Sequence, residues 1–404
     1  MSDDHWPRLS RRGFLAGTIA AALAACSSDD SDSGTSSPAT TDGAPTTSAG
    51  APTTTGTTET TATTATTVDT TDAPTTTITS DPFTLGVASG DPLADSVILW
   101  TRLLPADPLA DADIDVTWEV ARDEAFTDVV ADGTAPAVAA LAHSVHVDAT
   151  GLEADTEYWY RFSVDGFTTT PARTRTFAAP GTTPERFRFA FSSCQNWEQG
   201  YYAAYRDLVE QGDIDAFVFL GDYIYEYASG GYADDRSRQT GQDFECETVE
   251  QYRERYALYQ SDPLLQNAHA LVPWIITWDD HEVDNNYAGA ISENDDDPAE
   301  FLERRANAYQ AWYEHMPVRL DPPDGPDYEI YRSFAHGDLV AFHVLDTRQY
   351  RADQQRSEPF VAPLGDDVQV RDEALANDPE QTMLGEAQRN WLIDGVAAVS
   401  YTHL

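Results

Sequence analysis

The chain has few basic residues. Among 404 residues, 24 Lys and Arg stand against 69 Asp and Glu, which gives a formal net charge of −45. A surface this acidic repels nucleic acid and anionic lipid, so DNA-binding and membrane-surface roles are disfavoured. The charge is most simply explained by solubility. An anionic substrate would need local positive charge, which metal ions could supply.

Cysteine is also scarce, with only Cys26, Cys194 and Cys246. A disulfide between Cys194 and Cys246 is arithmetically possible in an exported protein, but we expect none, because Cys194 sits among candidate ligands and Cys246 in an acidic loop. The sequence lacks a Gly-x-Ser-x-Gly elbow and a P-loop. Acyl transfer and nucleotide hydrolysis of those types are therefore unsupported.

The N-terminus also lacks a long hydrophobic run. Residues 10–15 (Ser-Arg-Arg-Gly-Phe-Leu) have the twin-arginine pattern, and the apolar segment 16–25 is too short to span a bilayer. Leu-Ala-Ala before Cys26 resembles a lipobox, although ordinary cleavage near Ala25 is an alternative. We expect residues 1–26 to be a signal peptide that directs export as a cell-surface or periplasmic lipoprotein, which can also be released. Membrane contact would be made only through a lipidated Cys26.

The rest of the chain divides by composition into three parts. Residues 27–80 are a Thr/Ala/Pro-rich linker that cannot bury a core and is expected to be disordered. Residues 81–180 carry short alternating strands that predict a fibronectin- or immunoglobulin-like β-sandwich. Residues 181–404 alternate strand and helix patterns, which predicts a layered α/β domain with ligands on its loops.

Three apolar strands of the predicted α/β domain end in polar side chains. Phe187–Phe191 leads to Cys194, Ala216–Leu220 leads to Gly221 and Asp222, and Trp274–Trp278 leads to Asp279-Asp280-His281-Glu282. The carboxyl ends of parallel strands meet at one edge of a sheet. The pattern therefore predicts one metal site at that edge.

The individual ligands differ in character. Asp222 can bridge two metals, with Gly221 allowing the sharp exit from the strand, although an Asp there can also cap a helix or turn. A thiolate from Cys194 and a phenolate from Tyr225 would favour iron over magnesium alone. Taken singly, Cys194 and Tyr225 would be interpreted as packing residues.

The segment Trp278–Asn286 is dense in oxygen and nitrogen donors. Asp280 and Asn286 are candidate ligands, and His281 is a candidate acid or transition-state donor. A helix cap at Asp284 or a calcium-stabilised loop without chemistry is the structural alternative.

Two further charged features follow. Arg348, after another apolar strand, could form a fork on a phosphate, although an ion pair with one of the many acids is nearly as good an interpretation. The acidic run 295–297 is expected to be a solvated loop without a role.

Four motifs together resemble the PhoD-type alkaline phosphatases. They are Ser-Cys-Gln at 193–195, Leu-Gly-Asp-Tyr-Ile-Tyr-Glu at 220–226, Trp-Asp-Asp-His-Glu-Val-Asp-Asn-Asn at 278–286 and Leu-Asp-Thr-Arg-Gln-Tyr-Arg at 345–351. Gly-Val-Ala-Ser-Gly-Asp-Pro at 86–92 is similar to the opening of that family's N-terminal domain.

The resemblance implies a four-layer αββα metallophosphoesterase-like core and an enzyme that releases phosphate from mono- and diesters. It also implies a ferric iron and calcium cluster, with Cys194, Asp222 and Tyr225 at the iron positions and the second-metal ligands in the segment that holds Asp280 and Asn286. The family continues with a further strand and a Gly-Asp-containing His motif, which is missing here. We therefore expect the chain to be C-terminally incomplete, to fold poorly and to be weakly active or inactive.

The expected mechanism is metal-assisted hydrolysis, in which cations offset phosphate charge and activate a water. We expect a monomer that acts on small phosphate esters. The alternatives are a phospholipase-D-like phosphodiesterase on the same fold, and a non-catalytic surface lipoprotein that binds cell-wall glycan.

Overall fold

The computed structural model describes residues 77–232, 237–353 and 381–400. The predicted signal peptide with Cys26, and residues 27–76 of the predicted linker, lie outside these ranges. Within the described ranges, no helix is both long and apolar enough to cross a bilayer.

The N-terminal part is a β-sandwich, as the strand pattern predicts. One layer is an antiparallel sheet in the order β4-β3-β6-β7, with β8 also paired to β6. A buried apolar cluster joins it to β1, β2 and β5 of a second sheet. The Tyr158 hydroxyl accepts a hydrogen bond from the Glu153 N–H (2.8 Å), which is the tyrosine-corner contact of such sandwiches. The strands are β1 (Val87–Gly90), β2 (Ser96–Arg102), β3 (Ile114–Ala121), β4 (Val129–Ala137), β5 (Ser144–Thr150), β6 (Glu157–Val164), β7 (Phe167–Thr168) and β8 (Ala172–Arg175).

The second sheet of the sandwich continues into the α/β part. Its order is β5-β2-β1-β11-β10-β9, and β1 lies parallel to β11 with Gly90 opposite Trp274. A Cβ at Gly90 would lie 2.2 Å from the Pro317 carbonyl oxygen, so only glycine permits this approach. One sheet thus spans the predicted boundary at residue 180. The added strands are β9 (Phe189–Ser192), β10 (Ala216–Phe219) and β11 (Trp274–Ile276).

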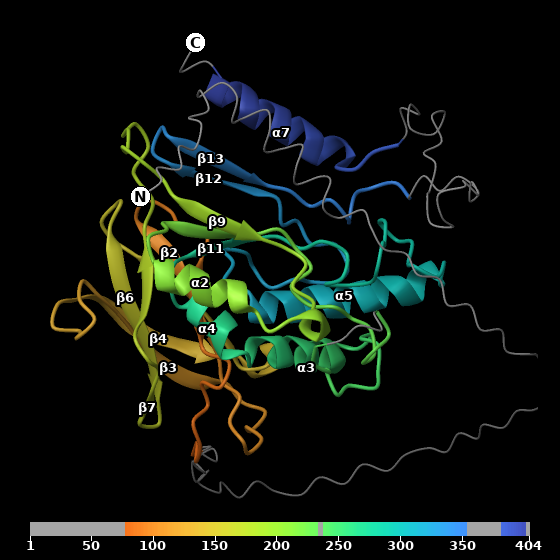
Figure 1. The fold of residues 1–404 in the computed structure, drawn as a ribbon, viewed down its shortest axis with the longest axis horizontal. Helices are drawn as coiled ribbons and strands as arrows, with labels where there is room; N and C mark the ends of the chain where they lie inside the picture. The colour runs from red at the N-terminus through yellow and green to blue at the C-terminus, as the bar shows by residue number, and fades with distance from the viewer. Residues whose placement is uncertain (1–76, 233–236, 354–380, 401–404) are drawn as a thin grey trace, which may run out of the picture. The chain divides into compact units, whose positions relative to one another are not determined.

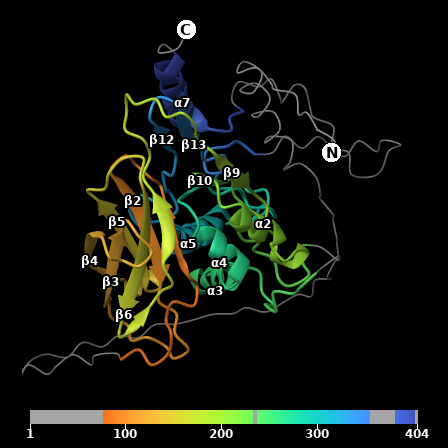
Figure 2. The same ribbon diagram turned by 60° about the vertical axis from the view of Figure 1, so that its left-hand side comes forward.

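Helices cover one face of the α/β part of this sheet. Alternation along β10 and β11 sends Phe217 and Phe219, with Trp274 and Ile276, into a large aromatic core shared with the helices. Figures 1 and 2 show these helices gathered on one side of the strands. They are α2 (Ala203–Gln211), α3 (Val249–Gln260), α4 (Pro263–His269) and α5 (Pro298–His315).

The opposite face of this sheet packs on a separate sheet of two strands. Ala216 and Ile275 point the other way along the same strands and meet Phe334 of β12 (Arg332–His336) and Val344 of β13 (Val340–Val344). Helix α7 (Gly385–Ser400) lies beyond that sheet (Figure 1). The four layers are therefore helix, sheet, sheet and helix, and the predicted αββα class is confirmed.

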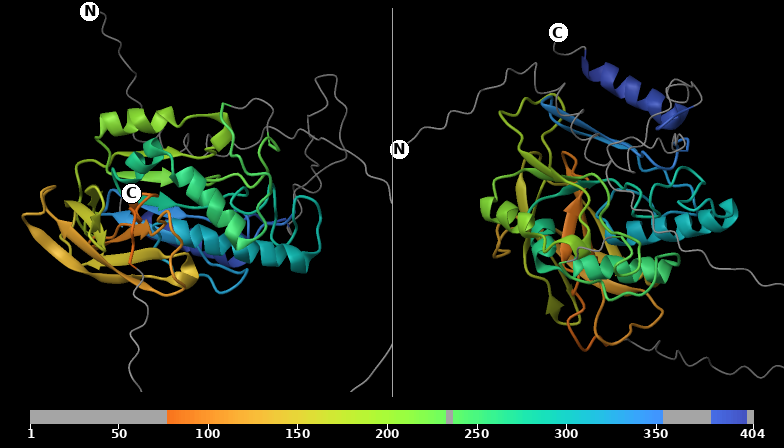
Figure 3. Two further views of the ribbon diagram at one scale, coloured as in Figure 1. Left: turned by 90° about the horizontal axis from the view of Figure 1, so that it is seen from below. Right: turned by 45° about the vertical axis from the view of Figure 1, so that its right-hand side comes forward.

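Local sequence fixes the start of the longest of these helices. Asp297 accepts a hydrogen bond from the Ala299 N–H (2.9 Å), and Pro298 occupies the first turn of α5, as an N-cap followed by proline requires. The acidic run 295–297, expected to have no role, therefore includes a helix cap. Figure 3 shows α5 from two further directions.

Candidate metal centre

The three polar strand ends lie at one edge of the sheet. β9, β10 and β11 are parallel neighbours, and their carboxyl ends lead to Cys194, Asp222 and Asp280. Ligand atoms of Asp222, Asp280 and His281 all lie within 4.8 Å of one another, and all three residues are buried. We call the two segments that bring them together, residues 220–226 and 278–286, the ligand loops.

The backbone at this edge takes unusual conformations. Cys194, Asp222 and Asn286 have φ of 56°, 58° and 56°, in the left-handed region that residues with a side chain seldom adopt. The Cys194 N–H donates to the Gly221 carbonyl (3.1 Å), which ties the end of β9 to the end of β10. Backbone strain of this kind gathers at functional sites, where surrounding contacts enforce it.

Gly221 allows the ligand loops to meet. Its φ is 103°, and a Cβ there would lie 2.3 Å from the backbone nitrogen of Asp279 and 2.6 Å from the carbonyl carbon of Trp278. No residue with a side chain fits without displacing the backbone. The sharp exit expected from the sequence therefore also serves a close approach of two loops.

Asp222 and Asp280 are buried acids that repel each other. Burial and the charge of Asp280 raise the pKa of Asp222 to about 7, although His281 and a hydrogen bond from the Cys194 side chain oppose the rise. Burial would also raise the pKa of Asp280, but Arg348 and His281 bring it below the ordinary value. A bound cation would relieve the repulsion between the two carboxylates.

Tyr225 and His281 form a stacked pair beside Asp222. Their ring centroids are 4.0 Å apart, and the Tyr225 hydroxyl donates to Asp222 Oδ2 at 3.4 Å. Tyr232 lies edge-on to both rings, with centroids 4.9 and 5.3 Å away. Burial would lower the pKa of His281, but the charge and hydrogen bond of Glu226 raise it to about 10. Glu226 thus favours the protonated form of the imidazole.

Arg348 reaches the site from the loop after β13. Its Nε donates to Asp279 (2.5 Å), and its Nη2 lies 3.1 Å from Asp280. The third nitrogen, Nη1, is buried and has no hydrogen-bond partner among the described residues. Both interpretations of Arg348 from the sequence therefore remain open, since it pairs with acids and keeps one donor for a further acceptor.

Asn286 joins the site through its backbone. Its N–H donates to Asp280 Oδ2 at 2.6 Å. The proposed role of its side chain as a ligand stays a prediction, as do the ligand roles of Cys194 and Tyr225. The structure does bring all three next to Asp222 or Asp280.

Two buried glutamates at the site were not identified from the sequence. Glu226 and Glu282 are 0% and 1% exposed, and each accepts hydrogen bonds from the opposite ligand loop. Both lie inside the motifs quoted above. Their closeness in sequence to Asp222 and His281 was the available signal. The local pattern does not show, however, that a glutamate at either position points inward.

The donor set fits a metal ion. Asp222, Asp279, Asp280, Glu226 and Glu282 are buried or nearly so. Arg348 pairs with Asp279 and Asp280, His281 pairs with Glu226, and the charges of Arg351 and Arg304 also act on this group. Carboxylate excess of this kind, with a thiol and a phenol adjacent, suits a hard or redox-capable cation. Iron and calcium are not distinguished by this geometry.

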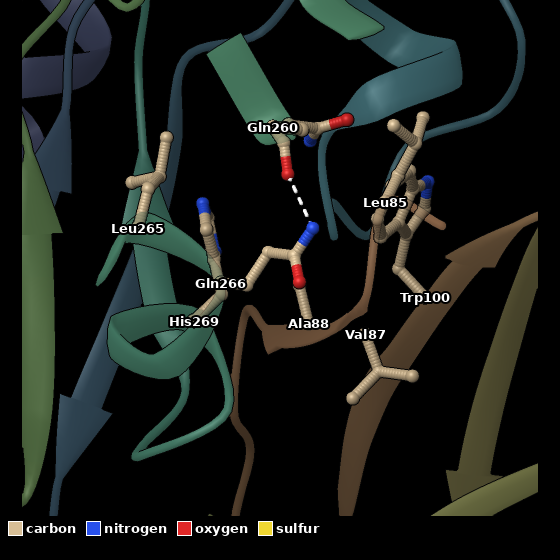
Figure 4. Close-up of a pocket in the computed structure, with 8 residues that line it drawn as sticks. All are labelled: Leu85, Val87, Ala88, Trp100, Gln260, Leu265, Gln266 and His269. Atoms are coloured by element: carbon tan, nitrogen blue, oxygen red, sulfur yellow. Dashed lines mark hydrogen bonds between the residues drawn. The ribbon is translucent and has the colours of Figure 1, made fainter. Parts of the chain in front are cut away.

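A hollow elsewhere in the protein is less suited to chemistry. It lies between β1, β2 and helices α3 and α4 and is lined mainly by apolar side chains (Figure 4). Burial lowers the pKa of His269, its one titratable lining residue, to about 3. Its other polar lining residues include Gln266, which donates to the Gln260 carbonyl at 2.7 Å. We assign it no ligand.

Comparison with known proteins identifies relatives across both parts of the chain. The family model described as PhoD-like phosphatase, N-terminal domain, matches residues 68–178, and that of PhoD-like phosphatase matches residues 189–402. Alkaline phosphatase D of Bacillus subtilis (strain 168) is 46% identical over 327 residues, which are 79% of this chain and 54% of that protein. A solved structure described as "Structure of PhoD" matches with a TM-score of 0.74 at 45% identity, covering 80% of this chain and 61% of that one.

The four layers and the acid-rich edge define a metallophosphoesterase-like protein. Within that class, the chain belongs to the PhoD-like phosphatase family, whose model matches more than half of its residues. The resemblance stated from the motifs is confirmed. The chain spans 54% of the length of the Bacillus protein and 61% of the solved chain.

Proposed function

We propose that this chain is a metal-dependent phosphoesterase that releases phosphate from small mono- and diesters. The observation that carries the proposal is the buried group of Asp222, Asp280 and His281 at the carboxyl edge of the sheet, whose two carboxylates repel each other. Family membership supports the same chemistry, since the Bacillus subtilis relative is named alkaline phosphatase D.

We assign the metals as the resemblance to the family implies. Cys194, Asp222 and Tyr225 would hold a ferric ion, and Asp280 and Asn286, with Asp222 as a bridge, would hold calcium. When bound, these cations supply charge stabilisation for the phosphate and a water acidic enough to react near neutral pH.

The protein's own side chains orient the ester and supply a proton. Nη1 of Arg348 has no hydrogen-bond partner among the described residues and would donate to a phosphate oxygen, while Asp279 and Asp280 hold the other guanidinium nitrogens. His281, held by Glu226 through Nδ1, would donate from its other nitrogen to the leaving oxygen.

We further propose that the protein acts outside the cytoplasm as a monomer. The support for export is the twin-arginine pattern and the lipobox-like segment before Cys26, both in the sequence alone. Residues 81–180 would form the sandwich domain and 181–404 the catalytic domain.

The test combines metal content with hydrolysis. Iron and calcium are measured in the purified 404-residue chain, and aryl phosphate monoester and diester hydrolysis is followed with and without EDTA. We expect bound metal, weak hydrolysis of both esters that is lost completely in EDTA, and at least about 100-fold less hydrolysis in Asp222→Asn, since even residues behind metal ligands contribute about 10–100-fold.

The outcomes separate the alternatives. Hydrolysis of the diester alone would favour the phosphodiesterase. A well-folded chain with no metal, and with hydrolysis no greater than that of Asp222→Asn, would favour a non-catalytic binding protein.

A further inference from the structure

Two buried glutamates connect the ligand loops in opposite directions. Glu226 belongs to the first loop and holds the second, while Glu282 belongs to the second loop and holds the first. Both side chains are almost completely removed from solvent. Neither has a metal-ligand or substrate role in the function proposed above.

Glu282 collects three backbone N–H groups. Its Oε2 accepts from Asp222 (3.0 Å) and Asp279 (2.8 Å), and its Oε1 accepts from Tyr223 (2.5 Å). One carboxylate therefore fixes the backbone on which Asp222 stands and the start of the segment that carries Asp280. Hydrogen bonds to a carboxylate are of the strong kind, and these three oppose the burial and the Asp222 charge, which together raise the pKa of Glu282 to about 8.

Glu226 makes the reciprocal connection. Its Oε2 lies 2.8 Å from His281 Nδ1, and its Oε1 accepts from the Asn285 N–H (2.8 Å). The imidazole orientation and the position of the residue before Asn286 thus depend on a side chain from the first loop. Each loop is held by the other at two or more points.

This arrangement opposes forces that would separate the loops. Asp222 and Asp280 repel each other, and Cys194, Asp222 and Asn286 occupy left-handed backbone conformations that need external support. A metal site is tight only when its ligands are held close before the ion arrives.

We propose that Glu226 and Glu282 are a reciprocal pair of positioning residues that set the spacing of Asp222, Asp280 and His281 for metal. The inference rests on the proposed function, because it needs a metal site at this edge. It assigns the glutamates an effect on metal affinity beyond their effect on folding.

The test compares metal retention in Glu→Gln variants. A glutamine keeps the shape but replaces one carboxylate oxygen by an NH₂ and removes the charge. In Glu282→Gln the NH₂ faces a backbone N–H, so a hydrogen bond is lost, and in Glu226→Gln either the bond from the Asn285 N–H or the ion pair with His281 is lost. Wild type, Glu226→Gln and Glu282→Gln chains are dialysed against increasing EDTA. Retained iron and calcium, the visible absorption of the iron site and the melting temperature are then measured.

We expect both variants to release metal at EDTA concentrations about 10- to 100-fold lower than wild type, the range seen for residues that orient metal ligands. The double variant should lose less than the product of the two single losses, because the glutamates act on the same pair of loops.

Glu314→Gln is the matched control. Glu314 is equally buried but lies on α5, where Arg253 donates to it at 2.7 and 2.6 Å. We expect this control to lower the melting temperature while the EDTA midpoint and the absorption stay at wild-type values.

Three results would overturn the proposal. They are unchanged metal retention in folded Glu226→Gln and Glu282→Gln, an equal shift in Glu314→Gln, and failure of both site variants to fold while Glu314→Gln folds. If wild type itself retains no metal, the proposed function fails, which is a different outcome from failure of the glutamate pair.

Discussion

Charged side chains are buried in several places, and two of these places differ in how the buried acids are paired. At the ligand loops, Asp222 and Asp280 lie next to further acids, and only Asp280 of the two forms an ion pair among the described residues. The second place is where β2 and β5 of the sandwich meet α3 and α5. Its interface cluster consists of Arg102, His146, Arg253, Glu314 and His315.

In the interface cluster the buried acid has a basic partner. Glu314 is fully buried and is held by Arg253, and Arg102 contacts His315 at 2.7 Å and the Ala142 carbonyl at 2.8 Å. Burial lowers the pKa of His315 well below its usual value, with the nearby Arg102 charge acting in the same direction, so the ring stays neutral. The cluster joins the two parts of the chain.

The difference separates a structural polar cluster from a candidate site. Burying charge is costly in both places, but Glu314 has an arginine partner, whereas Asp222 forms no ion pair with a basic side chain that the structure describes. At the ligand loops, burial and the charge of Asp280 raise the pKa of Asp222, and a bound cation would stabilise its charged form. A buried acid without a basic partner, rather than a buried charge as such, marks the site.

The largest effect is expected at the interface cluster. Arg253→Met removes the cation and leaves Glu314 buried beside Gln310, which should lower the free energy of unfolding by about 3 kcal/mol. Denaturant unfolding measures the loss, and metal retention should not change. Arg122→Met, which breaks only the exposed pairs with Asp128 and Glu153, is the control and should have no measurable effect. Equal losses in both variants would contradict the comparison.

An effect of similar size, on catalysis rather than stability, is expected from Arg348→Ala. Removing a preorganised donor to the phosphate should lower kcat by about 100- to 1,000-fold. Because Asp279 and Asp280 lose their cation, metal should be retained at least as tightly as in wild type. Arg348→Lys should not restore activity, since a lysine cannot donate as a fork to both acids and the phosphate.

Steady-state kinetics and metal analysis of Arg348→Ala together decide the role of Arg348. Near-normal kcat with lower stability would make it only an ion-pair partner. Loss of metal in Arg348→Ala would show that the acids need the arginine to stay in place.

The smallest effect concerns pH. Burial lowers the pKa of His146 to about 4, although the Met316 and Tyr313 carbonyls oppose the shift. The unfolded chain therefore binds a proton near pH 6.5 that the folded chain does not, so the stability is complete above that pH and falls as the pH drops toward 4. We expect a loss of about 1–2 kcal/mol, reduced from the full shift because the ring is not wholly shielded from solvent.

Denaturant unfolding at about pH 7 and about pH 4.5 measures this loss. In His146→Gln the free energy of unfolding should depend less on pH, because one histidine with a lowered pKa is gone while His315 remains. The same slope in both proteins would show that His146 does not report on the interface cluster.

Much of the fold was predictable because its signals are local. Residues 157–164 alternate apolar and polar side chains and form β6 over that range, and residues 298–315 form α5 after a capping Asp297 and Pro298. The ends of β9, β10 and β11 were predicted within a few residues, because glycine and acids follow the apolar runs. The candidate ligands were found for the same reason.

What was missed depends on contacts between distant segments. The pairing of β1 with β11 joins residues more than 180 positions apart, and neither strand carries a sign of its partner. Glu226 and Glu282 look like surface acids in a chain that has 69 acidic residues. Only their burial between two loops separates them from the others.

The sequence by itself determined which segments become strands and helices, because periodicity and turn chemistry act over a few residues. It also determined that acids, a thiol and an imidazole follow the ends of three strands. Tertiary structure alone decided which acids face each other without a cation, which glutamates hold the loops together and that one sheet joins both parts of the chain. Those properties depend on distance and on exclusion of water, and both arise only when remote segments pack.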